Sequence, residues 1–229
     1  ADRLPCHALD MTESDAMTAA TPITGDVFIV DQPFTMFVNT YFVSRPADDR
    51  FTPGEALAYC RQKAFAFKED LRFHPTQTSE DELFRIKARR TIDFGGRYDV
   101  TDTDGVVLGA LERRARQSLF RTTWGILDAD GTELAFAQER SVPSAIFRRI
   151  QNVLQFIPLV GWALDLVLDL IPIPYHFDIL RDGELIGHQT RKRGIRDRYR
   201  LEITGDPERR IDRRLVIALG VGLDALQSR

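Results

Sequence analysis

The sequence contains little cysteine, and this shortage excludes two kinds of architecture. Only two of its 229 residues are cysteines, Cys6 and Cys60, and a single pair makes no disulfide framework. Neither cysteine has the spacing of a metal-ligand pair, so we expect no metal site and no cofactor. A signal peptide would need an apolar core near the beginning of the chain, and none occurs there. The sequence therefore indicates a protein of the reducing cytoplasm.

Catalytic signatures are also missing. The four histidines, His7, His74, His176 and His188, are scattered along the chain without a nucleophile motif near them. No Gly-x-Ser-x-Gly elbow, phosphate-binding loop or HExxH motif occurs. We therefore expect a non-enzymatic protein and interpret Cys60 as a small core residue. A formal net charge of -3 argues against a nucleic-acid-binding protein.

The sequence contains three Asp-Gly pairs in similar surroundings. The stretches read YDVTDTDGVVLGAL, WGILDADGTELAFA and FDILRDGELIGHQ. In each, an apolar alternating run precedes and follows the pair, which is typical of a β-hairpin with a tight turn. A calcium loop would need a later glutamate that these stretches lack. The predicted turns are Asp104-Gly105, Asp130-Gly131 and Asp182-Gly183.

Further segments rich in β-branched and aromatic residues fill the gaps between these hairpins. In 83–89, Phe84, Ile86 and Ala88 alternate with Arg85, Lys87 and Arg89, as in a strand with one buried face. Together with both arms of the hairpins they give roughly a dozen strands, which need a closed barrel or a large sandwich to remove their edges. The additional predicted strands are 27–31, 35–43, 57–67, 70–74, 83–94, 116–127 and 199–204.

The end of the chain predicts a helix over residues 213–226, RRLVIALGVGLDAL. Such a helix would be about 20 Å long and apolar on every face over most of its length, so it has to be enclosed. A barrel of roughly a dozen strands has room for a helix inside. We therefore predict a mainly β fold, a closed antiparallel barrel around its own C-terminal helix. A buried last strand is the alternative.

One barrel domain is expected over residues 25–229, preceded by a disordered leader or tail over 1–24, because Met11 begins a plausible start. An apolar insert at 146–172 predicts a further helix. Three placements stay open for it: a cap on the barrel, a membrane interface or a protein partner. The residues expected to make the membrane or partner contact are Phe156, Leu159, Val160, Trp162 and Leu166.

Two basic clusters predict a site for phosphate groups, because guanidinium groups offer paired donors and keep their charge. Both follow or precede hairpin strands, so they could meet at one rim of the barrel. The alternative is that they form the solvated face of strands, neutralised by acids such as Glu112 and Asp197. The predicted head-group residues are Arg113, Arg114, Arg116, Arg191, Lys192, Arg193 and Arg196.

The chain resembles the LURP-one-related family of the tubby-like C-terminal superfamily, which also contains tubby domains and phospholipid scramblases. The resemblance runs through LFRIKARRTIDFGGRYDVTDTDG, YHFDILRDGELIGHQTRKRG and DRRLVIALGVGLDAL, and covers roughly residues 57–226, except most of 146–172. It implies a tubby-like twelve-stranded antiparallel barrel around a hydrophobic helix. Tubby domains bind phosphoinositides and scramblases act at membranes, but no binding motif of either matches here residue by residue.

Two functions follow as expectations. The first is binding of anionic lipid head groups or a membrane surface, by a cytoplasmic protein that lies peripherally at the inner face of the membrane. The second is a soluble scaffold or small-ligand-binding barrel, whose insert caps its own core or binds a protein partner.

Overall fold

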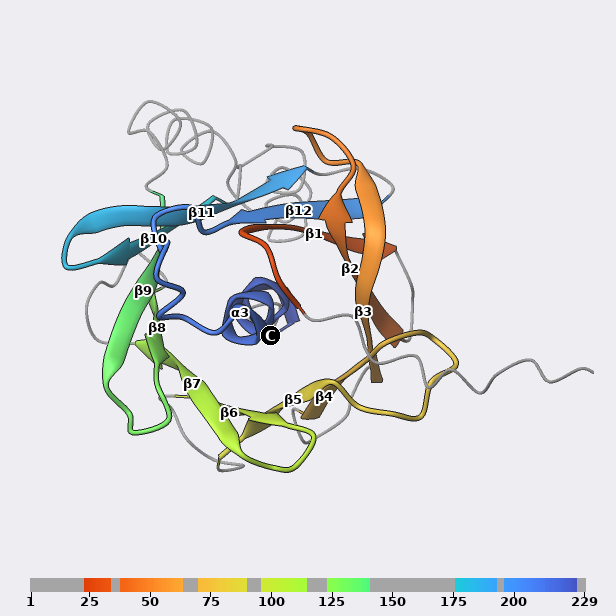
Figure 1. Cartoon of the computed structure of the whole chain (residues 1–229), viewed down its shortest axis with the longest axis horizontal. Coiled ribbons are helices and arrows are strands. Elements are labelled where there is room, and N and C mark those ends of the chain that lie inside the picture. The colour runs from red at the N-terminus through yellow and green to blue at the C-terminus, as the bar shows by residue number, and fades with distance from the viewer. Residues whose placement is uncertain are drawn as a thin grey trace, which may run out of the picture.

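Twelve β-strands form a closed antiparallel barrel in the computed structural model, which describes residues 23–33, 38–63, 70–89, 96–114, 123–140, 176–192 and 196–225. The helix α3 (Arg213–Ala225) fills the centre of the ring, where Figure 1 shows it nearly end-on. The predicted barrel around a C-terminal helix is confirmed. The strands are β1 (Val27–Pro33), β2 (Val38–Pro46), β3 (Pro53–Lys63), β4 (Asp70–His74), β5 (Phe84–Ala88), β6 (Arg97–Asp102), β7 (Val107–Arg114), β8 (Thr123–Leu127), β9 (Glu133–Glu139), β10 (Phe177–Arg181), β11 (Glu184–Lys192) and β12 (Arg196–Glu202).

Each strand pairs with its neighbours in the chain, and β1 pairs with β12 to close the ring. Because the strands run up and down, the connections alternate between two ends of the barrel. One end, named here the turn end, holds the connections β2–β3, β4–β5, β6–β7, β8–β9 and β10–β11. The opposite end is named the rim. The strand ends at the rim are Pro33, Val38, Lys63, Asp70, Ala88, Arg97, Arg114, Thr123, Glu139, Phe177, Lys192 and Arg196.

The three predicted Asp-Gly hairpins are confirmed at the turn end. They connect β6 to β7, β8 to β9 and β10 to β11, all antiparallel. Asp182 and Gly183 both have positive φ, 52° and 84°, as the two central residues of the tightest hairpin turn require. Asp102 and Asp128 add side-chain hydrogen bonds to backbone N–H groups of the first two turns.

The predicted alternation in β5 is also confirmed. Phe84 and Ile86 are buried in the barrel interior, whereas Arg85 and Lys87 point outward. Arg85 pairs with Asp70 on the neighbouring strand β4, so the outer wall is held by ion pairs while the interior is held by apolar packing. Phe73 and Phe84 stack with ring centroids 4.1 Å apart.

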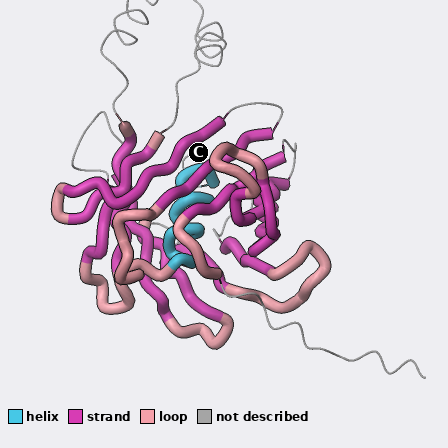
Figure 2. The backbone as a smooth tube through the Cα atoms, turned by 45° about the horizontal axis from the view of Figure 1, so that its top comes forward, coloured by secondary structure: helices cyan, strands magenta, loops and turns pink. Residues whose placement is uncertain are grey.

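Helix α3 runs along the inside of the barrel, as Figure 2 shows. Leu215, Ile217 and Leu219 are at most 1 % exposed, so the helix is buried on all sides by the strands. Glycines allow its close approach to the wall. A Cβ at Gly220 would lie 2.9 Å from a methyl of Leu201, and one at Gly109 on β7 would lie 2.8 Å from Leu215. This enclosed position explains why the helix is apolar on every face over its central residues.

Several strand boundaries differ from the prediction, three of them informatively. β2 continues to Pro46 and β3 begins at Pro53, because prolines are tolerated at strand ends and at the register shifts found after Val43. β12 begins at Arg196 rather than Tyr199. The prediction missed these residues because the beginning of the strand, RDR, is entirely charged and has no apolar alternation. The predicted insert 146–172 and residues 1–22 of the predicted leader 1–24 lie outside the described residues. In the part of the chain that the structure describes, no helix is long and apolar enough to cross a membrane.

Candidate functional site

The predicted basic residues lie at the rim, in two groups. Arg113 and Arg114 end β7, while Arg191 and Lys192 end β11 and Arg196 begins β12. The strands β8, β9 and β10 separate the two groups in the ring, so the clusters share one end of the barrel without forming one contiguous patch. Arg116 and Arg193 lie outside the described residues, as do Phe156, Leu159, Val160, Trp162 and Leu166.

Three of these side chains take part in ion pairs within the barrel wall. Arg114 reaches across β8 to Glu133 on β9, passing over Gly125, which has no side chain to block it. Arg196 contacts Asp31 on β1 at 3.4 Å, and its side chain is 50 % exposed. Asp31 also accepts a hydrogen bond from Arg198 at 2.9 Å, so it has two cationic partners.

Arg191 belongs to a polar network on the inner face of the rim. It pairs with Asp197, and its guanidinium carbon lies 5.3 Å from the ring centre of Tyr199. The Tyr199 hydroxyl donates to Gln32 Oε1 at 3.3 Å, and Gln32 Nε2 donates to the Tyr41 hydroxyl at 3.5 Å. The network links β11, β12, β1 and β2 and fixes Arg191 against the wall. Asp197 neutralises Arg191, as the alternative prediction for the basic clusters had it.

Arg113 and Lys192 differ from the other three. Both are exposed, and among the described residues neither side chain takes part in an ion pair or side-chain hydrogen bond. The backbone N–H of Arg113 donates to the Gly96 carbonyl at 3.0 Å, which fixes the main chain and leaves the guanidinium available. Of the predicted basic residues that the structure describes, these two cations therefore have the most freedom to meet an external anion.

Charge is distributed unequally between the two ends of the barrel. The last two residues of each strand include eight basic and four acidic side chains at the rim, and three basic and four acidic side chains at the turn end. At the turn end, the connections between paired strands and the segment leading to α3 contain three basic side chains, Arg50, Arg209 and Arg210, and twelve acidic ones. The acidic residues are Asp48, Asp49, Glu80, Asp81, Glu82, Asp104, Asp128, Asp130, Asp182, Asp206, Glu208 and Asp212.

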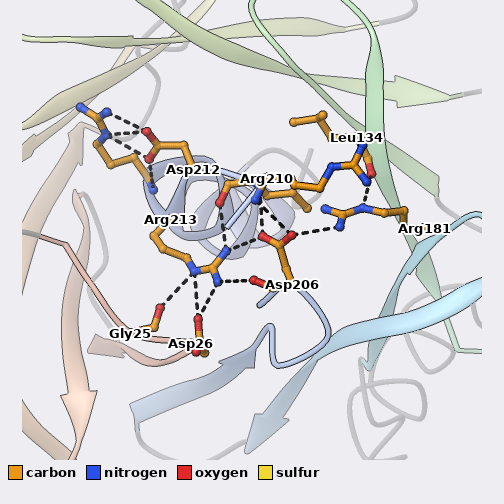
Figure 3. Close-up of polar contacts among 10 residues, drawn as sticks. Gly25, Asp26, Leu134, Arg181, Asp206, Arg210, Asp212 and Arg213 are labelled. Atoms are coloured by element: carbon orange, nitrogen blue, oxygen red, sulfur yellow. Dashed lines mark hydrogen bonds and ion pairs between the residues drawn. The ribbon is translucent and has the colours of Figure 1, made fainter. Parts of the chain in front are cut away.

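A buried ion-pair network closes the turn end around the beginning of α3. Asp206, with no exposed side-chain surface, contacts Arg213 at 2.8 Å and Arg181 at 2.9 Å, as Figure 3 shows. Arg213 also donates to Asp26 and to the Gly25 carbonyl, just before β1. The network joins β10, the helix and the beginning of β1, so its position indicates a structural role.

Nucleophilic chemistry finds little support among the described residues. Cys60 is fully buried, and burial raises the pKa of its thiol to about 12, so the thiolate is scarce at neutral pH. This confirms the interpretation of Cys60 as a core residue. His74 contacts the Asp81 carbonyl and His188 lies 3.6 Å from Glu202. In the described ranges, no three His, Cys, Asp or Glu side chains gather as metal ligands.

Comparison with models of known protein families identifies the family of this chain. The model, LOR: LURP-one-related, matches residues 57–224. The chain belongs to the LURP-one-related family. The resemblance read from the sequence is confirmed, and the protein is a tubby-like β-barrel of a family that is not known as catalytic. No match is found among curated proteins.

Sequence reasoning missed several residues that shape the rim of this LURP-one-related barrel. Asp31, Gln32 and Tyr41 come from β1 and β2, far along the chain from the arginines that they position. Arg198 and Asp31 are separated by 167 residues, so no local pattern announces their pairing. The sequence could have predicted that Arg113 points to the inner face of the barrel, because Arg113 lies two residues after the apolar Leu111 in the same strand.

Proposed function

We propose that the protein binds anionic lipid head groups at a membrane surface through the rim of its barrel, without catalysis. The observation that carries this proposal is the unequal charge of the two ends. An anionic surface attracts the rim, where basic side chains outnumber acidic ones, and repels the acidic turn end. The difference in charge between the two ends therefore orients the barrel with its rim toward the anionic membrane. The resemblance to proteins that act on or at membranes supports the same reading.

The residues that supply this attraction are the exposed cations Arg113, Lys192 and Arg196. Each basic residue near an anionic surface contributes about 1 kcal/mol. Arg196 shares Asp31 with Arg198, so replacing Arg196 leaves that buried carboxylate with a cationic partner. Arg191 is left out because its pairing with Asp197 makes it part of the wall.

The proposal also assigns a location. Negative lipids are concentrated in the cytoplasmic leaflet, so a barrel with this charge distribution is suited to a peripheral position at the inner face of the membrane.

The test is co-sedimentation with vesicles of phosphatidylcholine, with and without phosphatidylserine, at low and high salt. We expect binding to the anionic vesicles that weakens with salt. The triple variant Arg113→Gln, Lys192→Gln, Arg196→Gln should lose about a hundredfold in affinity, at an unchanged melting temperature. If wild type fails to bind anionic vesicles at low salt, the proposal is wrong.

A second candidate, a soluble scaffold or ligand-binding barrel, is favoured by the ion pairs of the wall. Arg114, Arg191 and Arg196 each have an acidic partner, which is what solvated strand faces need for stability alone. Helix α3 fills the centre of the barrel, so a ligand of this second kind would have to bind near a rim or on the outer wall. Absence of binding to every vesicle would favour this candidate.

A further inference from the structure

Two arginines face the inside of the barrel at the rim, and their surroundings differ. Arg191 pairs with Asp197 and lies over the ring of Tyr199. Arg113 is on the other side of the ring, and no described acidic side chain lies within ion-pair distance of it. One interior cation is therefore neutralised by the protein itself, while the other has no anionic neighbour of its own.

The register of β7 and β8 fixes the direction of Arg113. Leu111 pairs with Ile126, and both are core residues; two residues further, Arg113 pairs with Trp124, also a core residue. Side chains two residues apart in a strand share a face, so the register places Arg113 on the inner face, as the cross-strand neighbour of Trp124. Arg114, the next residue, points outward to Glu133.

The Trp124 indole reaches toward β6, past the strand that bears Arg113. Its ring contacts that of Tyr98 with centroids 5.8 Å apart, and Tyr98 is on β6, on the far side of β7. To make this contact the indole crosses the inner face of β7, the strand that bears Arg113. Trp124 is 1 % exposed, and its Nε1–H donor has no hydrogen-bond partner. A buried donor without an acceptor is uncommon and calls for an explanation.

The surroundings of this pair are rich in donors and poor in acceptors. On the inner face of β6, β7 and β8, the other described residues toward the rim carry no carboxylate: they are Tyr98, Val100, Leu111 and Ile126. Asp102, in the same row of β6, lies at the turn end and accepts hydrogen bonds from backbone N–H groups of its own turn. Among the described residues of β8 and β9, the acidic residue on this inner face toward the rim is Glu139 on β9, and it makes no ion pair with Arg113. A guanidinium and an indole N–H together suit an oxyanion, because both only donate.

We propose that Arg113 and Trp124 form an oxyanion subsite on the inner face of the rim, which takes a phosphate or carboxylate group. Arg113 supplies the charge and paired donors, and Trp124 Nε1 supplies a single directed donor. The inference rests on the proposed function for its source of oxyanion, the head group of an anionic lipid; free phosphate has the same chemistry and is the other source.

Trp124 provides the readout. In a Trp162→Phe background it is the only tryptophan, since the chain has two. We expect its fluorescence to change saturably with inorganic phosphate and with phosphatidylserine vesicles, and not with phosphatidylcholine vesicles. Arg113→Gln should weaken the phosphate response at least tenfold. Arg114→Gln, the matched control one residue away on the outer face, should leave it unchanged.

A second measurement does not depend on fluorescence. Phosphate binding by ³¹P line broadening should be lost in Trp124→Phe, which keeps an aromatic ring and removes the donor. The double variant Arg50→Gln, Arg209→Gln should keep the phosphate affinity of wild type, because those exposed cations lie at the turn end of the barrel.

The outcomes separate this subsite from the proposed function. Phosphate binding that needs Arg113, without any binding to vesicles, supports the subsite and overturns the membrane proposal. Binding to anionic vesicles that weakens in the triple variant of Arg113, Lys192 and Arg196, without a phosphate response, supports the membrane proposal and overturns the subsite. No phosphate response in either measurement overturns the subsite whatever the vesicles show.

Discussion

The carboxylate of Asp206 and the guanidinium of Arg213 form an ion pair 2.8 Å long, with side chains 0 % and 4 % exposed. Asp206 also accepts hydrogen bonds from Arg181 and from the backbone N–H of Ile211. It precedes α3 in the chain, and Arg213 is the first residue of the helix. The pair therefore fixes the point at which the helix enters the barrel.

Replacing Asp206 with Asn should be among the most destabilising single changes in the protein. It leaves Arg213 and Arg181 buried without their shared anion, and breaking a buried pair costs about 3–5 kcal/mol. The measurement is urea unfolding followed by circular dichroism. Asp212→Asn is the matched control: asparagine still caps the helix, and only the ion pair with the partly exposed Arg214 is lost, so we expect a loss of at most about 1 kcal/mol. Equal losses in both variants would contradict the assignment.

Stability should fall in acid, partly because of the same carboxylate. Burial by itself raises the pKa of Asp206. The hydrogen bonds from Arg213, Ile211 and Arg181 lower this pKa by more than burial raises it, so the pKa lies below its ordinary value. A carboxyl whose pKa is lower in the folded state stabilises the fold at neutral pH. This contribution is lost as pH falls from about 4 through the folded pKa. The free energy of unfolding should depend less on pH in Asp206→Asn over this window; identical slopes would refute the idea.

Helix α3 should be indispensable for folding. Deleting residues 213–229 removes the apolar filling of the barrel, and each buried Leu, Ile or Val contributes about 1.5–3 kcal/mol out of a total of about 5–15. A milder change, Leu219→Ala, should cost about 2–5 kcal/mol, because Leu219 is 1 % exposed. Analytical ultracentrifugation and thermal melts provide the measurements. A truncated chain that remained monomeric and melted cooperatively would contradict a central helix.

The segment between β9 and β10 should be dispensable for the barrel. The two strands pair as far as Glu139 and Phe177, and beyond them the Arg140 N–H donates to the His176 carbonyl at 2.8 Å. Arg140 also pairs with Asp178, so the base of the connection is held on both sides. Replacing residues 141–175 with Asn-Gly fits a two-residue hairpin turn. We expect a folded protein with a similar melting temperature; a large drop would show that the insert covers the core.

Much of the fold could be predicted because its signals are local. An Asp-Gly turn needs positive φ at neighbouring positions, and Asp182 and Gly183 show it. The alternation of Phe84 and Ile86 with arginine and lysine defines a strand within a few residues. An apolar segment with no polar face, such as α3, leaves enclosure as the only stable solution in water.

The candidate site could be predicted only in part, because its contacts join distant parts of the chain. At the rim, Arg198 meets Asp31 across 167 residues, and no pattern in the sequence pairs them. The two basic clusters were expected to meet, and they share the rim, but the width of three strands separates them. Which arginines are neutralised depends on the register of neighbouring strands, as Arg114 and Glu133 show across Gly125.

The central claim is that the rim faces an anionic membrane, and two variants of equal charge test it most directly. One removes three cations from the rim, Arg113→Gln, Lys192→Gln, Arg196→Gln. The other removes three exposed cations from the turn end, Arg50→Gln, Arg209→Gln, Arg210→Gln. Both change the net charge equally, so any difference reports position. In co-sedimentation with phosphatidylserine vesicles at low salt, we predict that the rim variant loses about a hundredfold in affinity while the turn-end variant binds like wild type. Equal losses in the two variants, or none in either, would contradict the account.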